Sequence, residues 1–128
     1  MSIKEMINEH PDVAGHMNEP LAEAVKHAMY CAAICNSCAD ACGAEDGDRR
    51  DCIRSCMDCS DVCTATYRVA SRRTGRNVIV LRNMLEVCAS TCEACAEHCA
   101  MHDDAHCKRC EKMCRECAAD CRKAIQTL

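Results

Sequence analysis

Residues 31–42 read CAAICNSCADAC and residues 88–99 read CASTCEACAEHC, so one cysteine pattern occurs twice with closely similar spacers. The same C-x3-C-x2-C-x3-C spacing recurs in residues 52–63 and 110–121. At about 100° per residue, four cysteines with this spacing lie within an arc of about 60° on one side of an α-helix. Each block therefore predicts a helix with a stripe of sulfur, and the likeness of the first and third blocks indicates a duplicated helical hairpin.

The composition leaves the chain little else from which to build a core. Of 128 residues, 17 are cysteine, and leucine, isoleucine and valine together also number 17, while phenylalanine and tryptophan are absent. This share of branched aliphatic residues is well below that of an ordinary globular domain. The formal net charge of −4 argues against nucleic acid as a partner. The sequence predicts one small helical domain folded around its sulfur.

The cysteines are expected to be free thiols or metal thiolates. The first residues lack the apolar segment of a secretory signal, and the longest aliphatic run is residues 78–81, so neither a signal nor a membrane span is expected. We therefore expect a cytoplasmic protein, in a compartment where thiols stay reduced. The odd number of cysteines also argues against a disulfide framework.

Turn-forming residues between the cysteine blocks divide the chain into helices. They predict an all-α fold, an antiparallel four-helix bundle over residues 20–128. Its helices are expected near residues 20–43, 48–73, 77–101 and 105–126. Residues 1–19 are expected to form a short N-terminal helix and a linker, because Ser2 and Glu5 fit a capping box.

Cysteines that face each other across an antiparallel hairpin should have residue numbers with a constant sum. The sum is 94 in the first hairpin and 209 in the second, for the pairs Cys31 with Cys63, Cys35 with Cys59, Cys38 with Cys56, Cys42 with Cys52, Cys88 with Cys121, Cys92 with Cys117, Cys95 with Cys114 and Cys99 with Cys110. The sulfurs are therefore predicted to stack in four layers and to line the core at one end of the bundle.

The other end is predicted to hold a conventional apolar plug that maintains the fold when the sulfur end is empty. Continuing the two sums gives the pairs His27 with Tyr67, Met84 with Ile125, Ala24 with Ala70, and Leu81 with Leu128. Residues 78–80 are expected nearby. His27 is expected to be a satisfied core histidine hydrogen-bonded to Tyr67, with metal ligation beside Cys31 as the alternative.

Seventeen cysteines on inward stripes argue against inert packing, since alanine or valine would fill the same space without the risk of oxidation. Thiolates favour soft metals such as Cu(I) and Zn²⁺. Four Zn²⁺ sites of four thiolates each would bury a charge of about −8, whereas one Cu(I) per thiolate adds no net charge. The chain is thus predicted to bind multiple Cu(I) ions, the alternatives being a zinc or heavy-metal thiolate buffer and a thiol redox protein. No catalytic triad or phosphate loop is present, so an enzyme is not expected.

The loop between the third and fourth helices supplies further soft ligands at the open end. His98, Met101, His102 and His106 lie around this loop, and the second sum places the extra Cys107 opposite His102. Imidazole and thioether groups could pass Cu(I) inward to the sulfurs. The other interpretation is a polar loop that caps the fourth helix.

The four helical cysteine blocks, the cysteine-filled end and the histidines and methionine at its mouth resemble the cytosolic branch of the bacterial copper storage proteins, the Csp family. The resemblance covers residues 20–128 and implies a four-helix bundle, often assembled as a homotetramer, that serves copper homeostasis by storing many Cu(I) ions in a tube open at one end. The charge and the lack of a long apolar run predict no nucleic-acid or membrane partner, and a copper chaperone or chelator is a possible partner.

The same resemblance implies the ligands of copper. They are Cys31, Cys35, Cys38, Cys42, Cys52, Cys56, Cys59, Cys63, Cys88, Cys92, Cys95, Cys99, Cys107, Cys110, Cys114, Cys117 and Cys121. The histidine at the mouth of the tube corresponds to His102 or His106, with His98 as a further candidate.

Overall fold

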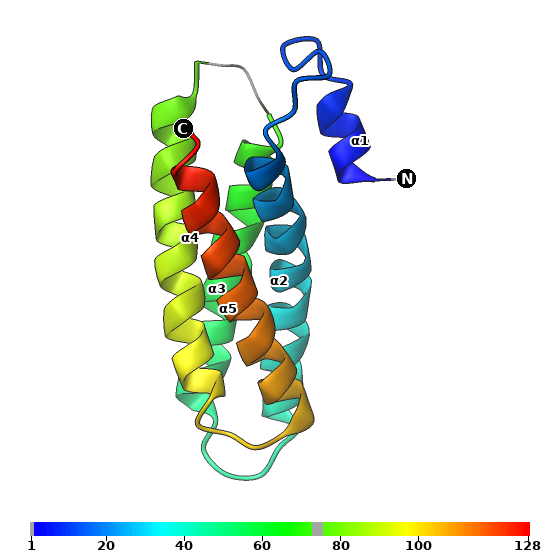
Figure 1. The fold of residues 1–128 in the computed structure, drawn as a ribbon. Coiled ribbons are helices and arrows are strands. Elements are labelled where there is room, and N and C mark those ends of the chain that lie inside the picture. The colour runs from blue at the N-terminus through cyan, green and yellow to red at the C-terminus, as the bar shows by residue number, and fades with distance from the viewer. Residues whose placement is uncertain (1, 73–75) are drawn as a thin grey trace.

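Four long antiparallel helices enclose a common core, and a short leading helix lies outside them (Figure 1). The structure is a computed structural model that describes residues 2–72 and 76–128. Its helices are α1 (Ile3–Asn8), α2 (Glu19–Gly43), α3 (Arg50–Ala70), α4 (Val78–Cys99) and α5 (Ala105–Ile125). Both α2 and α4 pack against α3 and α5, so the hairpins α2–α3 and α4–α5 lie side by side. The predicted all-α four-helix bundle is confirmed.

The helix bounds differ from the predicted ones by a few residues. Helix α3 begins at Arg50 rather than at residue 48, because the Asp48 side chain accepts a hydrogen bond from the Arg50 amide (3.0 Å) just ahead of the helix. The predicted end of this helix, residue 73, lies outside the described residues. The division into a leading segment (1–19) and a bundle (20–128) stays a prediction. None of the described helices is both long and apolar enough to cross a membrane.

Polar side chains fix the first turns of α1 and α2. The Ser2 hydroxyl accepts hydrogen bonds from the amides of Lys4 (3.1 Å) and Glu5 (3.5 Å). Asn18 accepts one from the Leu21 amide (3.0 Å), and a proline follows at the start of α2. These groups satisfy backbone donors that have no partner within the helix, so they define where each helix begins.

An apolar plug fills the bundle beyond the cysteines, as predicted. In the first hairpin, however, the plug pair next to the cysteines differs from the predicted one. The sequence predicted His27 opposite Tyr67, whereas the fully buried residues are Ala28 and Thr66, whose numbers have the same sum. An inward stripe alternates steps of three and four residues. After the step of four from Cys35 to Cys31, the next inward residue is three positions away, at Ala28. The prediction used a second step of four, to His27, and was wrong.

The same correction applies to the second hairpin. Leu85 and Ala124 are fully buried there, in place of the predicted Met84 and Ile125, which are half-buried. Leu85 is one of the largest fully buried side chains. The residues predicted one turn further on do belong to the core, since Ala24, Ala70 and Leu81 are buried and Leu128 is partly buried against them.

The valine-rich start of α4 does not join the plug. Val78, Ile79 and Val80 are 37%, 77% and 50% exposed, so they lie beside Leu81 of the plug, as predicted, without being buried in it. The inward stripe of this helix runs through Leu81 and Leu85, and residues 79 and 80 therefore face away from the core. They form an apolar surface on the outside of α4.

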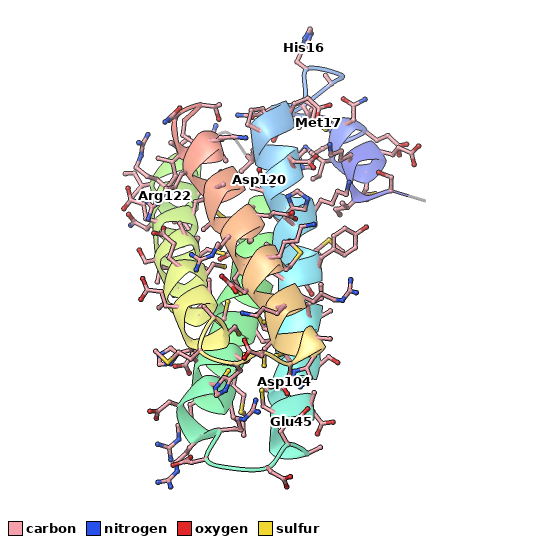
Figure 2. The ribbon with its side chains drawn as sticks, turned by 60° about the horizontal axis from the view of Figure 1, so that its bottom comes forward. His16, Met17, Glu45, Asp104, Asp120 and Arg122 are labelled. Carbon is pink, nitrogen blue, oxygen red and sulfur yellow. The ribbon has the colours of Figure 1, made fainter. Side chains whose placement is uncertain are left out.

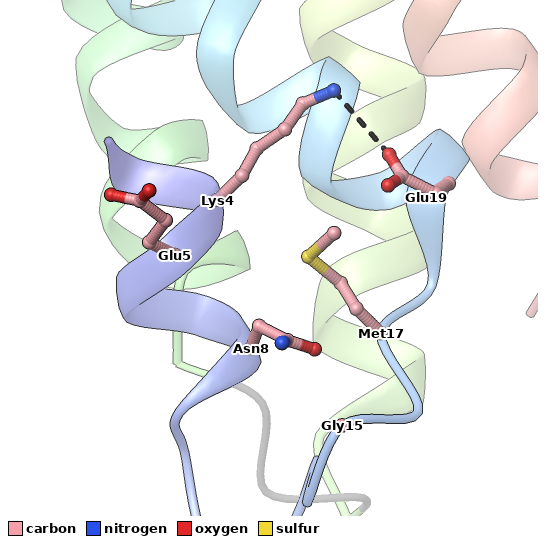
Figure 3. A pocket seen from close by; sticks show the side chains of 6 residues that line it. All are labelled: Lys4, Glu5, Asn8, Gly15, Met17 and Glu19. Carbon is pink, nitrogen blue, oxygen red and sulfur yellow. Dashed lines mark hydrogen bonds and ion pairs between the residues drawn. The ribbon is translucent and has the colours of Figure 1, made fainter. Parts of the chain in front are cut away.

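Helix α1 rests against the beginning of α2, at the end of the bundle that holds the plug (Figure 1). Ile7 of α1 is buried. Lys4 forms one ion pair with Glu19 (3.3 Å, Figure 3) and a second with Glu23. A surface hollow of about 350 Å³ lies here, lined by Lys4, Glu5, Asn8, Gly15, Met17 and Glu19. It lies at the opposite end of the bundle from the loops that follow the first and third cysteine blocks.

The plug is expected to carry much of the stability of the metal-free protein. Leu85→Ala should lower its free energy of unfolding by about 2–5 kcal/mol, because it leaves a cavity among fully buried side chains. Urea unfolding of the reduced protein, followed by circular dichroism, measures the change. Met57→Ala is the control, since Met57 is 54% exposed on α3 and its truncation should cost at most about 0.5 kcal/mol. Equal losses for the two variants would contradict the assignment.

Candidate metal centre

All 17 cysteines point into the bundle. Each is at most 2% exposed, and each is a free thiol. They come from α2, α3, α4 and α5, and they occupy the end of the bundle away from α1. We call this end, where the loops 44–49 and 100–104 lie, the mouth. A continuous column of thiols thus leads from the plug to the mouth.

The pairing predicted within each hairpin is confirmed near the mouth. The sulfur atoms of Cys38, Cys56, Cys99 and Cys110 all lie within 4.8 Å of one another. This group contains one predicted pair from each hairpin, Cys38 with Cys56 and Cys99 with Cys110. Facing cysteines therefore converge on the bundle axis from all four helices.

The two hairpins are staggered by one step, so the predicted four layers are wrong. In the group just described, Cys99 and Cys110 are the pair nearest the loop of the second hairpin. They lie level with Cys38 and Cys56, which are only the second pair from the loop of the first hairpin. As a consequence the extra Cys107 lies level with Cys42, and their sulfurs are 3.7 Å apart. The constant sums fix the register inside a hairpin, but they carry no information on how one hairpin slides along the other.

The sulfurs form five levels instead of four. From the mouth inward these are Cys42, Cys52 and Cys107; Cys38, Cys56, Cys99 and Cys110; Cys35, Cys59, Cys95 and Cys114; Cys31, Cys63, Cys92 and Cys117; and Cys88 with Cys121. In the last level the inward positions of α2 and α3 are taken by Ala28 and Thr66.

Sulfur atoms lie close together both along a helix and between helices. Cys31 and Cys35, one turn apart on α2, are 3.8 Å apart, and Cys35 and Cys114 are 3.5 Å apart across the bundle. Two-coordinate binding at a metal–sulfur distance of about 2.3 Å requires sulfurs about 4.6 Å apart. A small separation of each pair, as the thiol protons leave, therefore suffices to admit an ion.

Burial and hydrogen bonding give the thiols unequal acidities. Burial raises the pKa of Cys107 to about 11, and burial together with the neighbouring Cys107 also raises the pKa of Cys42. Deeper in the column, hydrogen bonds from neighbouring thiols, that of Cys110 first, lower the pKa of Cys114 to about 7. Thiolate is the form that binds a soft cation, so a metal must displace the proton wherever the pKa is raised.

His106 is the histidine that the structure brings to the thiols. Its Nδ1 is 3.5 Å from the sulfurs of both Cys38 and Cys107, and these three residues form a four-ligand group with Cys42. Its Nε2 faces a carboxylate oxygen of Glu45 at 3.1 Å. The hydrogen bond with Cys38 raises the pKa of His106, burial opposes this, and Glu45 adds to the increase.

His98 and His102 lie at the mouth but apart from this group. They line a cavity of about 250 Å³ together with Asp48, Asp51, Cys52 and Met101. The side chain of Met101 is 73% exposed. The structure therefore places His102 and Cys52 in one cavity wall, whereas among the described hydrogen bonds only His106 links an imidazole to the cysteines.

Three charged residues at the mouth were not predicted as part of the site. Arg49 donates a hydrogen bond to Asp104 (2.6 Å) and reaches to 4.0 Å from the sulfur of Cys107. Glu45 contacts His106 as described, and Figure 2 shows Glu45 and Asp104 at the same end of the bundle. All three lie in or next to loops, outside the helical periodicity, so only their closeness in sequence to the cysteine blocks could have singled them out.

His27 is not hydrogen-bonded to Tyr67, and that prediction is wrong. Its Nδ1 pairs with Asp120 of α5 and its Nε2 lies 3.5 Å from Glu23 of α2. The correction follows from the stripe, since Ala28 takes the inward position and turns His27 toward the surface between α2 and α5. Its polar partners lie on the outside of the bundle.

The fold is closely similar to solved structures of Ccsp, a copper storage protein from Streptomyces lividans. A form loaded with 10 copper equivalents has a TM-score of 0.93 and 38% sequence identity, and the match covers 99% of this chain and 100% of that chain. A form with five coppers, described as a cytosolic copper storage protein, has a TM-score of 0.82 and 42% identity, covering 86% and 95%. A variant of Ccsp with two histidines replaced by alanine has a TM-score of 0.84 and 40% identity, covering 88% and 98%.

A comparison with curated proteins gives no significant match. The model of the family described as copper storage protein, Csp, matches residues 17–126. This match spans most of the sequence, and the chain belongs to the copper storage protein family.

Proposed function

We propose that the protein stores and detoxifies Cu(I) in the cytosol by binding many ions to cysteine thiolates inside its four-helix bundle. The observation that carries the proposal is the column of 17 buried, free thiols that extends to the mouth. Its sulfurs lie in contact with one another across all four helices. Such a column has a large capacity for a soft cation.

Charge favours Cu(I) over Zn²⁺ as the stored ion. Each Cu(I) that replaces one thiol proton leaves the charge of the interior unchanged, so the column stays near neutrality as it fills. A Zn²⁺ ion held by four thiolates leaves about two negative charges in the core. The four-sulfur groups also share members, Cys35 and Cys110 among them, and shared sulfurs suit a cluster of bridged ions better than separate tetrahedral sites.

A redox function is less well supported by the geometry. Neighbouring cysteines on one helix are a full turn apart, and i,i+4 side chains place their Cβ atoms farther apart than a relaxed disulfide requires. The thiols also share hydrogen bonds throughout the column instead of forming one isolated reactive pair. We therefore propose stoichiometric storage without catalysis.

As ligands we propose all 17 cysteines, with His106 as the first group to bind the ion and His102 and His98 as accessory groups in the adjoining cavity. The two histidines replaced in the Ccsp variant are four residues apart. Both His98 with His102 and His102 with His106 have this spacing. The contacts of His106 with two sulfurs favour the second pair.

We also propose a homotetramer. The first turn of α4 exposes the side chains of Val78, Ile79 and Val80 next to one another, and a contiguous exposed apolar patch is a feature of protein interfaces. The cytosolic location rests on the description of the similar Ccsp protein.

Titration of the reduced protein with Cu(I) under anaerobic conditions, against a competing chelator, tests storage directly. We expect ten or more ions per chain, since the similar Ccsp form was loaded with 10 copper equivalents, and a release of thiol protons that parallels uptake. Saturation at four or fewer ions would exclude a storage tube. Zn²⁺ that stays bound in the presence of the Cu(I)–chelator complex would favour the zinc buffer instead.

His106→Ala is expected to slow the uptake of the first Cu(I) ions several-fold and to leave the total capacity nearly unchanged, because the 17 thiols remain. Stopped-flow transfer from a coloured Cu(I) chelator measures the rate. His16→Ala is the matched control, since His16 is exposed at the opposite end of the bundle (Figure 2). The role of His106 is refuted if both variants take up copper at the rate of the natural chain.

Sedimentation equilibrium of the reduced protein is expected to give four times the chain mass of 14.1 kDa. Ile79→Lys places a charge on the apolar surface of α4, where 77% of the isoleucine is exposed, and should shift the mass toward that of one chain while the helical circular dichroism stays the same. A natural chain that sediments as a monomer would rule out the tetramer.

A further inference from the structure

Glu45, His106 and two cysteines form a connected set at the mouth. Glu45 lies in the loop between α2 and α3, and His106 lies in the first turn of α5. One ring nitrogen, Nε2, is 3.1 Å from the Glu45 carboxylate, and the other, Nδ1, is 3.5 Å from the sulfurs of Cys38 and Cys107. The imidazole thus bridges a carboxylate on its outer side and the thiol column on its inner side.

A carboxylate can only accept a hydrogen bond, so the hydrogen of the bond to Glu45 is carried by Nε2. In the neutral ring the lone pair for a metal is then the one on Nδ1, which is the nitrogen that faces the sulfurs. Metal-binding histidines commonly donate their second N–H to a carboxylate or carbonyl, which fixes both the tautomer and the direction of the ring. The arrangement at His106 has this form.

We infer that Glu45 is a positioning residue for copper uptake, which holds the Nε2 hydrogen of His106 and so directs Nδ1 toward Cys38 and Cys107. The inference rests on the proposed storage function. In the uptake step, Cu(I) forms one bond to Nδ1 and one to the sulfur of Cys107, while its bond to the donor's ligand breaks. The thiol proton of Cys107 leaves to solvent, and copper stays in the +1 state.

The position of Glu45 is itself fixed by neighbouring structure. Its amide donates a hydrogen bond to the carbonyl of Cys42 (3.2 Å), which ties it to the end of α2. At the other end of the same loop Arg49 is bound to Asp104, directly ahead of α5. The loop is therefore held against the start of the helix that carries His106, and the carboxylate needs no rearrangement to reach the ring.

Three variants separate this role from a general effect of charge at the mouth. Glu45→Ala removes the acceptor, Glu45→Gln keeps an acceptor oxygen without the charge, and Asp46→Asn removes one negative charge from the adjacent exposed residue. For Glu45→Ala we expect the first phase of Cu(I) uptake to slow by about tenfold or more, in the range found when carboxylate partners of metal-binding histidines are removed. Glu45→Gln should restore a large part of the rate, and Asp46→Asn should leave it unchanged.

Nitrogen-15 NMR of the histidine rings in the metal-free protein supplies a readout that a merely structural role would not change. At alkaline pH, where the ring is neutral, His106 of the natural chain should carry its hydrogen on Nε2. In Glu45→Ala the hydrogen should be distributed over both nitrogens. An unchanged tautomer in Glu45→Ala, or an equal slowing of uptake in Glu45→Ala and Asp46→Asn, would overturn the inference.

The total capacity, measured in the same titrations, distinguishes the two proposals. A capacity of four or fewer ions in the natural chain refutes storage. Full capacity in every variant, with no effect of Glu45→Ala on tautomer or rate, refutes only the role of Glu45.

Discussion

Contact of thiol with thiol along the bundle axis is the interaction on which this structure depends. Cysteine is small, so the four helices can converge on one column in which sulfurs from different helices lie 3.5–4.0 Å apart. Each cysteine buries less hydrocarbon than a leucine would, and the largest fully buried side chains, Leu21, Leu81 and Leu85, accordingly lie in the plug. Packing of apolar side chains in the plug stabilises one end of the bundle. The sulfurs at the other end can therefore exchange their protons for metal ions.

The stagger of the two hairpins explains the odd number of cysteines. Level hairpins would make four complete layers from 16 sulfurs and leave Cys107 above them without an equivalent on any other helix. With the stagger, Cys107 supplies the sulfur of α5 in the mouth level beside Cys42, and the two surplus sulfurs of the second hairpin, Cys88 and Cys121, extend the column toward the plug. The column is therefore longer and narrower at its two ends than four equal layers would be.

The sequence predicted the helices and the pairing inside each hairpin because both follow from a local repeat. The cysteine spacing determines which face of a helix is buried, and a tight antiparallel connection determines which residues face each other. The pairs Ala28 with Thr66 and Leu85 with Ala124 were also within reach, since they continue the alternation of three and four steps that the cysteines define. The stagger between the hairpins could not be predicted in this way. It depends on how the side chains of the two hairpins pack against each other, and neither sum of residue numbers contains that information.

The contacts at the mouth follow from the same stagger. Two contacts at the mouth join the hairpins. Glu45 and Arg49 belong to the first hairpin, and their partners His106 and Asp104 belong to the second. A slide of one helical step, about 5 Å, would carry each residue past its partner and would separate Cys42 from Cys107. The packing between the hairpins thus sets both the depth of the sulfur column and the set of polar residues that meet at its mouth. For this reason the mouth could be located from the sequence only as a region, while the particular histidine that faces the thiols could be identified only from the assembled bundle.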